Sequence, residues 1–321
     1  MPASDAPYER PDLSYKLPLV SVIIPVFNRE KALATALRSV ADQSFPDWEV
    51  IVVDDCSSDN SAEVALRIGQ QGKVRVIRHE NNLGSSAARN TGILAARGRF
   101  VSFLDSDDSW HPEKLRRQVE LTQADSNPDM VFCVTQTYVF RGGGLAGILP
   151  KRAPLPEEPW SEFLYMNGGF AQTNTFFLTR ELAMRVGFRS NPVVTPNEDH
   201  LFFLNLGALG ARYRLVPEPL SSWNDDSRPD RLCLGLRLES CRRYLDEAGS
   251  LITERARLAF QVRSLGPLLL KENPREAVKV FKEAVRLGAV RRHHLLFVVA
   301  RYALPASTVG LLRRMIYLLK S

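Results

Sequence analysis

The first hundred residues of the chain alternate between short apolar runs and helical patterns, and this alternation restricts the fold more than any other feature. VSVIIPVFN at residues 20–28 is a β-branched run typical of a parallel strand covered on both faces, and a helical pattern follows at 29–43. Strand patterns return at residues 48–54, 74–78 and 99–104. Strands that alternate with helices of this length are joined by right-handed crossovers. The sequence therefore predicts an α/β fold with a mostly parallel sheet and helices on both faces.

Polar residues stand where three of these strands end. Residues 25–28 close the first strand, Asp54 and Asp55 close the second, and residues 105–107 close the fourth. In open α/β sheets, ligands bind at the carboxyl ends of the strands. We therefore expect these three groups to lie together and to form a binding site.

The segment VSFLDSDDSW, residues 101–110, leads a strand directly into three carboxylates, Asp105, Asp107 and Asp108. A hard divalent cation takes oxygen ligands and, once bound to one or two carboxylates, keeps coordination positions for phosphate oxygens. The motif is equally compatible with a solvated acidic turn in which Asp108 caps a helix that begins near His111. From these residues alone, both interpretations stay open.

The motifs agree in order and spacing with one known family. The resemblance rests on VSVIIPVFNRE, then SVADQSFPDWEVIVVDDCSSD, then NLGSSAARNTGILAARGRFVSFLDSDD, and it covers about residues 19–220. These segments resemble the nucleotide-binding half of the bacterial family 2 inverting glycosyltransferases with the GT-A fold. The resemblance implies a nucleotide-diphosphate sugar donor, a UDP-sugar above all, a Mn²⁺ or Mg²⁺ ion, and transfer of the sugar with inversion.

The resemblance also assigns residues to the donor. Phe27 stands where the family often has tyrosine, so its ring would stack on the base without donating a hydrogen bond. The alternative is that Phe27 is an ordinary core aromatic. The residues that the resemblance places around the nucleotide sugar are Pro25, Val26, Phe27, Asn28, Glu30, Asp55, Arg89, Asp105 and Ser106.

Four of these positions have more definite implied roles. Asp55 matches the carboxylate that accepts from the imide N–H of the base, and we expect Asp54 to hold the turn. Arg89 matches a basic residue near the base or the diphosphate, and a surface ion pair is the alternative. The resemblance places Asp105 at the ribose and the metal and makes Asp107 the main metal ligand, which leaves Asp108 as a helix cap or a support behind the ligands.

Inversion also requires a general base that takes the proton of the attacking hydroxyl. VTPNEDHLFFLNLGALG, residues 194–210, opens an apolar helical stretch with Glu198 and Asp199. The resemblance makes Asp199 the base, although the helix dipole alone also favours acidic residues at a helix N-terminus. His200 is either a second contact to phosphate or a structural residue. Residues 168–188 are expected to lie under the acceptor.

The basic charge of the chain lies in its last third. From residue 226 to 321, nineteen Lys or Arg stand against nine Asp or Glu, while the whole chain has a formal net charge of +6. After Glu283, seven basic residues and no acidic residue are interleaved with apolar stretches much shorter than the roughly 20 residues of a spanning helix. Such a tail is typical of peripheral binding to an anionic membrane. Packing on the catalytic domain or on a second subunit, as an oligomer, is the alternative.

The composition of the chain indicates its cellular compartment and its division into domains. The first eighteen residues lack the apolar core of a signal peptide, and the four cysteines show no CxxC spacing. We therefore expect a cytoplasmic protein, with the inner face of the cell membrane as the alternative. The Gly- and Pro-rich stretch 145–159 is predicted to be a mobile loop. The predicted parts are a loose leader at 1–18, a transferase domain at 19–225 with a nucleotide half at 19–125 and an acceptor half at 126–225, and a basic helical extension at 226–321.

Together these patterns predict an enzyme that transfers a sugar to the hydroxyl of a saccharide or lipid-linked acceptor in bacterial cell-surface polysaccharide or glycolipid synthesis. Two other classes stay open. A nucleotidyltransferase would share the sheet and the carboxylates, but it needs a glycine-rich loop after the first strand, and PVFNREKA contains no glycine. A catalytically silent nucleotide-sugar-binding protein would keep Asp55 and Asp107 without needing Asp199. No nucleic-acid-binding motif accompanies the basic tail, so we expect no nucleic-acid partner.

Overall fold

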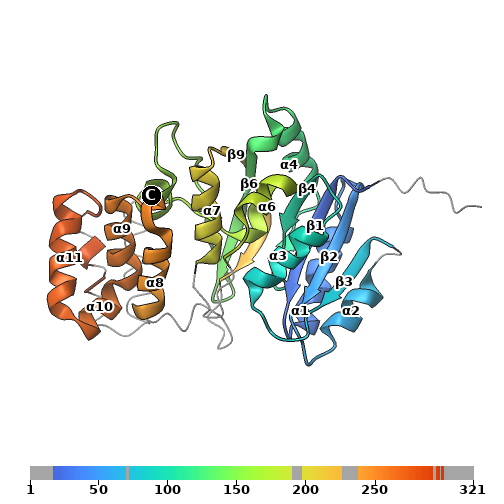
Figure 1. The fold of residues 1–321 in the computed structure, drawn as a ribbon, viewed down its shortest axis with the longest axis horizontal. Coiled ribbons are helices and arrows are strands. Elements are labelled where there is room, and N and C mark those ends of the chain that lie inside the picture. The colour runs from blue at the N-terminus through green and yellow to red at the C-terminus, as the bar shows by residue number, and fades with distance from the viewer. Residues whose placement is uncertain are drawn as a thin grey trace, which may run out of the picture.

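The structure is a computed structural model that describes residues 17–69, 72–189, 197–225, 238–291, 294–296 and 298–299. Over these residues, nine strands form a sheet in the order β3-β2-β1-β4-β8-β6-β9-β5, with β7 paired to β6. The sheet and its helices fill one side of the molecule, and the C-terminal helices fill the other (Figure 1).

Four parallel strands and the helices between them form the first half of the sheet, as predicted. β1 lies between β2 and β4, so that Val22 pairs with Val50 on one side and Ser102 on the other. Every residue of β2 is buried, which explains its continuous apolar run. The elements of this half are β1 Val20–Val26, α1 Glu30–Ala41, β2 Trp48–Asp54, α2 Ser61–Ile68, β3 Val74–Arg78, α3 Ser85–Ala95 and β4 Phe100–Phe103.

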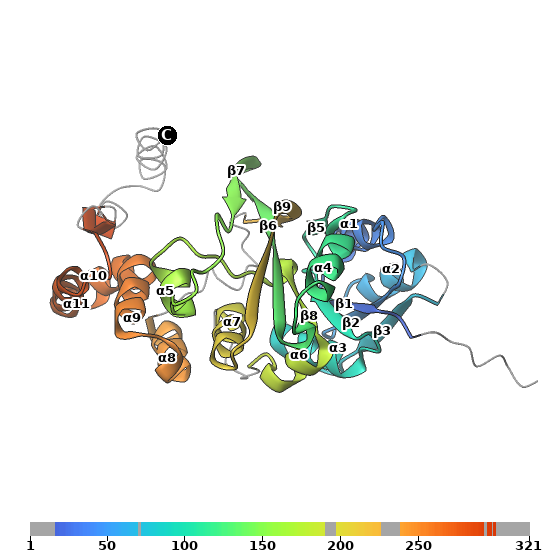
Figure 2. The same ribbon diagram turned by 90° about the horizontal axis from the view of Figure 1, so that it is seen from above.

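Helices cover both faces of the sheet. Because successive side chains of a strand point to opposite faces, neighbouring residues of β1 belong to different apolar clusters. Val22 packs in one cluster with α1, α2 and α4 (Lys114–Gln123), whereas Ile23 packs in the other with α3, α6 (Arg180–Val186) and α7 (Glu198–Ala208). Figure 2 shows α1 and α4 on one side of the strands and α3 and α6 on the other.

Beyond β4 the sheet becomes mixed, which refines the prediction of a mostly parallel sheet. β8 runs antiparallel to both β4 and β6, β5 runs antiparallel to β9, and β6 and β9 pair in parallel. β6 and β7 form a hairpin that turns at Gly142 and Gly143, both with positive φ (58° and 73°), a conformation that glycine adopts easily. The strands are β5 Ser109–Trp110, β6 Val131–Arg141, β7 Gly144–Leu149, β8 Phe176–Thr179 and β9 Arg212–Asn224.

The hairpin corrects one prediction. The stretch 145–159 was expected to be a loop, but its first five residues belong to β7 and bond to β6. Gly-rich sequence here makes a tight turn between two strands, and the chain then runs through irregular structure to α5 (Trp160–Tyr165).

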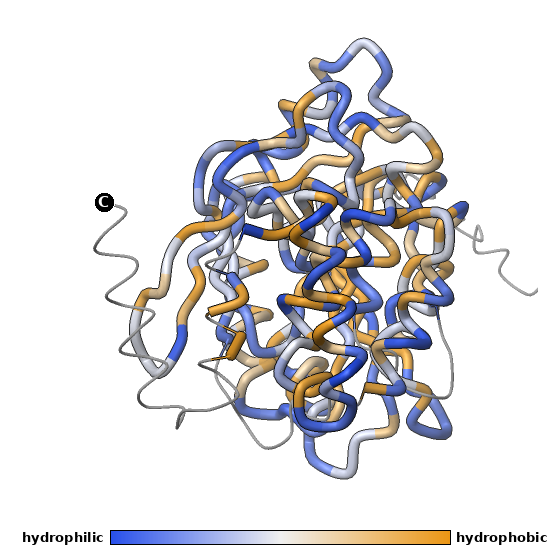
Figure 3. Tube along the Cα trace, turned by 90° about the vertical axis from the view of Figure 1, so that its left-hand side faces the viewer, coloured by the Kyte–Doolittle hydropathy of each residue, from blue (hydrophilic) through white to orange (hydrophobic). Residues whose placement is uncertain are grey.

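Helices α8 (Leu238–Ala248), α9 (Glu254–Phe260), α10 (Gly266–Glu272) and α11 (Pro274–Arg286) form the predicted helical C-terminal region. Hydrophobic and hydrophilic residues alternate along these helices (Figure 3). Their apolar faces join the cluster that contains α5 and α7, with Tyr244, Phe260 and Phe281 packed in the same core as Phe163 and Phe203. The C-terminal helices therefore continue the core that lies under the sheet.

Across the described ranges, no helix combines the length and the apolarity that crossing a bilayer requires. The predicted membrane-binding tail at 291–321 lies almost entirely outside the described residues. The leader up to residue 16 and the predicted domain boundary at 225–226 also fall outside them or at their edge.

Candidate active site

The loops that follow β1 and β2 are joined by reciprocal hydrogen bonds. The N–H of Asn28 donates to Ser57 Oγ (3.0 Å), and the N–H of Ser58 donates to Asn28 Oδ1 (2.8 Å). Asn28 has a φ of 51°, a left-handed conformation that asparagine tolerates better than most residues. With the two loops joined in this way, Phe27 has 45% of its surface exposed at the end of β1. The alternative that Phe27 is a core aromatic is therefore wrong.

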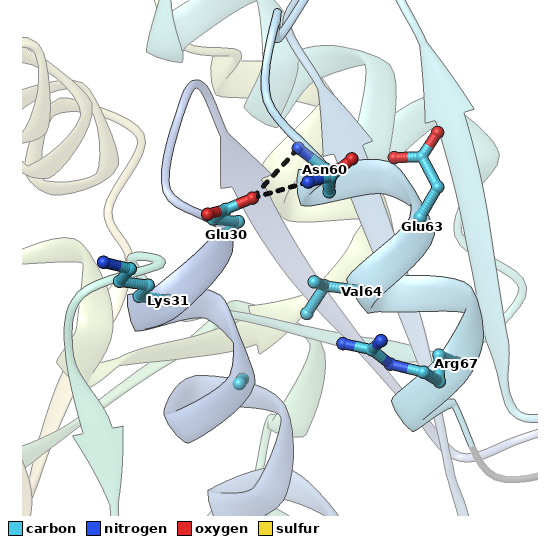
Figure 4. A pocket seen from close by; sticks show the side chains of 7 residues that line it. Glu30, Lys31, Asn60, Glu63, Val64 and Arg67 are labelled. Carbon is cyan, nitrogen blue, oxygen red and sulfur yellow. Dashed lines mark hydrogen bonds between the residues drawn. The ribbon is translucent and has the colours of Figure 1, made fainter.

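Glu30 stabilises the same region from the first turn of α1. Its Oε2 accepts hydrogen bonds from the N–H (3.2 Å) and the Nδ2 (3.0 Å) of Asn60, as the dashed lines in Figure 4 show. A groove of about 460 Å³ between α1 and α2 lies beside this contact, lined also by Glu63 and Arg67. The contact favours a role in joining the two helices over the predicted contact with the nucleotide sugar.

Pro25 and Val26 differ in exposure. Val26 is 2% exposed and packs in the core, so that its backbone rather than its side chain faces the strand end, where its carbonyl accepts from the N–H of Asp55 (2.9 Å). Pro25 is half-buried. Asp54 is fully buried and its Oδ1 accepts from the N–H of Ser57 (3.0 Å), which confirms that it holds the turn.

Asp55 is fixed at the end of β2 by three donors. Its Oδ1 lies 2.7 Å from His79 Nδ1 and accepts from the N–H of Leu83 (2.9 Å), while its Oδ2 accepts from the N–H of Gly84 (2.7 Å). The other ring nitrogen of His79 lies 2.9 Å from Thr91 Oγ1. A carboxylate oxygen can accept two hydrogen bonds, so Oδ2 keeps capacity for one further donor. This is what recognition of a base N–H requires.

Asp105 accepts hydrogen bonds on both of its oxygens. Arg89 Nη2 donates to Oδ1 (2.7 Å), and Oδ2 accepts from Thr173 Oγ1 (3.1 Å) and Gln172 Nε2 (3.0 Å). Because protein donors engage both oxygens, the structure favours a positioning role for Asp105 over the predicted direct metal contact. Ser106, which follows it, is buried.

Asp108 lies behind the loop, 3% exposed, and does not cap α4. That helix begins at Lys114 with Glu113 at its N-cap, so the prediction of a cap was wrong. Asn174 Nδ2 (2.6 Å) and the N–H of Asn224 (3.1 Å) donate to the carboxylate instead. Burial, together with the charges of Asp105 and Asp107, raises the pKa of Asp108 well above its ordinary value.

Asp107 is half-buried, and its backbone carbonyl accepts from Asn224 Nδ2 (2.8 Å). Within the described residues, no three His, Cys, Asp or Glu side chains form a ready metal cluster. Asp105, Asp107 and Asp108 nevertheless stand within four residues of one another, and a hard cation would relieve the repulsion between their charges. The residues therefore fit a cation that takes one carboxylate, Asp107, and completes its coordination with phosphate and water oxygens.

Arg89 connects the acidic loop to the start of α7. It is 5% exposed, and its guanidinium donates to Asp105 (2.7 Å) and to Glu198 Oε1 (3.1 Å). Burial opposes its charge, but the carboxylates of Asp105 and Glu198 raise the pKa of Arg89 above its ordinary value. The alternative of a surface ion pair is wrong, because this ion pair is internal, and the guanidinium is committed to protein carboxylates rather than exposed to a diphosphate.

Glu198 and Asp199 occupy the first turn of α7 and have different environments. Glu198 is held by Arg89 and by Ser85 Oγ (3.1 Å), whereas Asp199 Oδ1 accepts only from the N–H of His200 (2.8 Å) among the hydrogen bonds between described residues. Burial, followed by the charge of Glu198, raises the pKa of Asp199 to about 8. A carboxylate whose pKa lies near the working pH suits proton abstraction, and Glu198 is already ion-paired with Arg89. Both features favour Asp199 over Glu198 as the base.

His200 is a structural residue rather than a phosphate contact. Its Nδ1 lies 3.1 Å from the hydroxyl of Tyr165, and burial lowers the pKa of His200 to about 4. A half-buried neutral ring offers no charge to a phosphate.

Several polar residues of the site were missed from the sequence. They surround the acidic residues and come from three separate segments: His79, Gln172, Thr173, Asn174 and Asn224. The run 172–175 lies within the segment 168–188 that was expected under the acceptor, and its polar composition was the one available signal.

The fold and the site together define a class of protein: an α/β sheet with an acidic loop after β4 and a carboxylate pair at the start of α7. Residues 21–187, more than half of the chain, match the Glycosyl transferase family 2 profile, and the chain belongs to this family. It has the GT-A fold of that family's structures. The chain is 20% identical to Staphylococcus aureus TarS 1–349 in its crystal structure with UDP-GlcNAc, with a TM-score of 0.63 over 88% of each chain, a likeness that shows the fold.

Two curated relatives are similar in sequence. The amylovoran biosynthesis glycosyltransferase AmsB of Erwinia amylovora is 31% identical over 209 residues, which are 64% of this chain and 69% of AmsB. The UDP-Glc:alpha-D-GlcNAc-diphosphoundecaprenol beta-1,3-glucosyltransferase WfgD of Escherichia coli is 39% identical over 103 residues, which are 32% of this chain and 40% of WfgD. The match to WfgD thus spans well under two thirds of that enzyme.

Proposed function

We propose that this chain transfers a sugar from a UDP-sugar to an acceptor hydroxyl, with inversion at the anomeric carbon, in the synthesis of a bacterial cell-surface polysaccharide or glycolipid. One observation carries the proposal. Arg89 bonds to Asp105 in the acidic loop and to Glu198 at the start of α7. It thereby holds the residues proposed for the donor next to Asp199, the residue proposed to activate the acceptor. The names of AmsB and WfgD support the pathway, and the UDP-GlcNAc complex of TarS supports the donor.

The donor's base would bind at the ends of β1 and β2. The exposed ring of Phe27 offers a stacking surface, and Asp55 Oδ2 retains the capacity to accept from an imide N–H. A Mn²⁺ or Mg²⁺ ion held by Asp107 would supply charge neutralisation for the leaving diphosphate. Asp105 would act by holding Arg89, Gln172 and Thr173 in place around the sugar end of the site.

Asp199 would take the proton from the acceptor hydroxyl as that oxygen attacks the anomeric carbon. A new bond from the acceptor oxygen forms while the bond to the nucleotide diphosphate breaks, and one displacement of this kind inverts the configuration. Glu198 does not compete for the proton, because its carboxylate is ion-paired with Arg89. The raised pKa of Asp199 makes it a stronger base than an ordinary carboxylate.

Two observations support the proposed class of acceptor: the name of a relative and the basic residues near the C-terminus. A saccharide or a lipid-linked acceptor agrees with the diphosphoundecaprenol acceptor in the name of WfgD. Seven basic residues after Glu283 would bring the enzyme to the inner face of an anionic membrane. Self-association through the same tail is the competing proposal.

The test is release of UDP from a panel of UDP-sugars, with UDP-GlcNAc and UDP-Glc first, in the presence of Mn²⁺ and saccharide or lipid-diphosphate acceptors. We expect one UDP-sugar to be consumed, and UDP with Mn²⁺ to raise the melting temperature, because a ligand that binds only the folded state stabilises it. ADP- and GDP-sugars are the matched controls. If no nucleotide sugar is consumed or raises the melting temperature, the proposed function fails.

A further inference from the structure

A chain of hydrogen bonds, partly buried at His200 and fully buried at its tyrosine end, runs from the first turn of α7 into the C-terminal helices. The N–H of His200 donates to Asp199, the ring of His200 bonds to the hydroxyl of Tyr165 on α5, and that hydroxyl contacts the hydroxyl of Tyr244 on α8. These hydrogen bonds thus link Asp199, the proposed base, to α8, a helix that contributes no residue to the site described above.

The tyrosine end of this chain of hydrogen bonds is surrounded by apolar side chains. Tyr165 is 7% exposed and Tyr244 is fully buried, and both rings pack against Phe260 with centroids 5.2 Å apart. Burial raises the pKa of both phenols, so both hydroxyls stay protonated. Buried hydroxyls are costly without hydrogen-bond partners, so each of these groups depends on the others for its orientation.

The first turn of α7 is held on one side by the bonds of Arg89 and Ser85 to Glu198, and the side chain at its N-cap adds no further bond between described residues. Asn197 stands at the N-cap with a φ of 73°, and among the residues that the structure describes its side chain makes no capping hydrogen bond. The ring of His200 lies one residue from Asp199 on the same turn. What fixes this ring therefore also limits how the turn can rotate.

We infer that Tyr165 and Tyr244 are positioning residues for the transfer reaction: they hold the His200 ring, and through it the turn that aims Asp199 at the acceptor hydroxyl. The inference rests on the proposed function and extends it to the C-terminal helices. On this view α8 completes the active site from behind without touching a substrate.

The test compares Tyr244→Phe and Tyr165→Phe with the wild-type full-length chain. Phenylalanine keeps the ring packing and removes only the hydroxyl. The matched control is Tyr213→Phe, because the Tyr213 hydroxyl is buried in the same apolar cluster and has no hydrogen-bond partner among the described residues. Sites competent to bind are counted by calorimetric titration with UDP and Mn²⁺, and kcat is expressed per competent site.

We expect both variants to lose about tenfold in kcat, since small misplacement of a catalytic group costs up to about 10²-fold. The donor KM should stay within about twofold, as should the affinity for UDP, and Tyr213→Phe should match wild type. A second substitution, Tyr244→Leu, separates packing from hydrogen bonding: it should lose no more kcat per site than Tyr244→Phe.

Wild-type kcat in Tyr244→Phe, or a loss confined to Tyr244→Leu, would overturn the inference, because packing alone would then be the role of Tyr244. A parallel loss of UDP affinity would overturn it as well. If wild type itself transfers no sugar, the proposed function has failed instead. These outcomes are therefore distinguishable.

Discussion

Replacing Arg89 by methionine should destabilise the fold severely, because it leaves two carboxylates without their counter-charge. Arg89, Asp105 and Glu198 have 6%, 24% and 18% of their side-chain surface exposed, so solvent screens their ion pairs only in part. Breaking a buried ion pair by removing one partner costs about 3–5 kcal/mol. Partial exposure of the carboxylates argues for the lower end, about 3 kcal/mol, or roughly 4–5 °C in the melting temperature of a chain of this length.

The control is Arg99→Met. Arg99 forms a similar ion pair with Asp129 (2.9 Å) and lies over the Phe100 ring at 5.3 Å, just as Arg89 lies over Phe188 at 5.3 Å. Its pair is exposed, with 51% and 68% of the side-chain surfaces accessible, so its loss should cost about 0–1 kcal/mol. The two variants thus differ in the burial of the arginine and in the number of carboxylates that lose their partner.

The assay is urea unfolding followed by circular dichroism at pH 7, with wild type, Arg89→Met and Arg99→Met measured side by side. If Arg89→Met unfolds within about 1 kcal/mol of wild type at pH 7, as Arg99→Met should, the internal ion pair does not hold the two halves of the site together.

Three further predictions concern the chemistry and the tail. Asp199→Asn should lower kcat by about 10²- to 10⁴-fold with UDP binding retained. The kcat/KM of the wild type should rise with pH up to about 8 and then level off, because the base works deprotonated. A flat pH profile together with an active Asp199→Asn variant would assign the base to another residue. Asp107→Asn should weaken Mn²⁺-dependent UDP binding in calorimetry, whereas Asp108→Asn should change it little, since the buried Asp108 carboxylate is bonded to Asn174 and Asn224. Equal weakening by both would argue against Asp107 as the ligand. The full chain should co-sediment with anionic liposomes at low salt and a chain ending at Gly288 should not; equal behaviour of the two would make residues after 288 a packing or oligomerisation element.

The parallel half of the fold was predictable because its signals are local. Four apolar runs, three of them followed by the polar groups described above, indicate the strand type and the edge of the sheet at which ligands bind. Asp54, Asp55 and the acidic loop could be placed for the same reason.

The mixed half was not predictable, because its strands lack a clear pattern. β9 contains Pro217 and Pro219, which disrupt a strand pattern, and the pairing with β6 accommodates them by a register shift between Thr135 and Thr137. The pairing of Arg89 with Glu198 joins residues 109 positions apart, and nothing local distinguishes it from a surface charge pair. Side-chain pairing of this kind is a property of the assembled fold.

The shared core of the C-terminal helices and the transferase part has a consequence for how the protein unfolds. Tyr244, Phe260 and Phe281 pack in one cluster with Phe163 and Phe203, and apolar burial of this kind makes the parts of a structure melt together. Calorimetry should accordingly show one cooperative transition. A chain cut after residue 225 would expose the apolar sides of α5 and α7 and would be prone to aggregate. The C-terminal helices are therefore part of the folding unit. An exchange of C-terminal regions between relatives would have to preserve the apolar face that these helices turn toward α5 and α7.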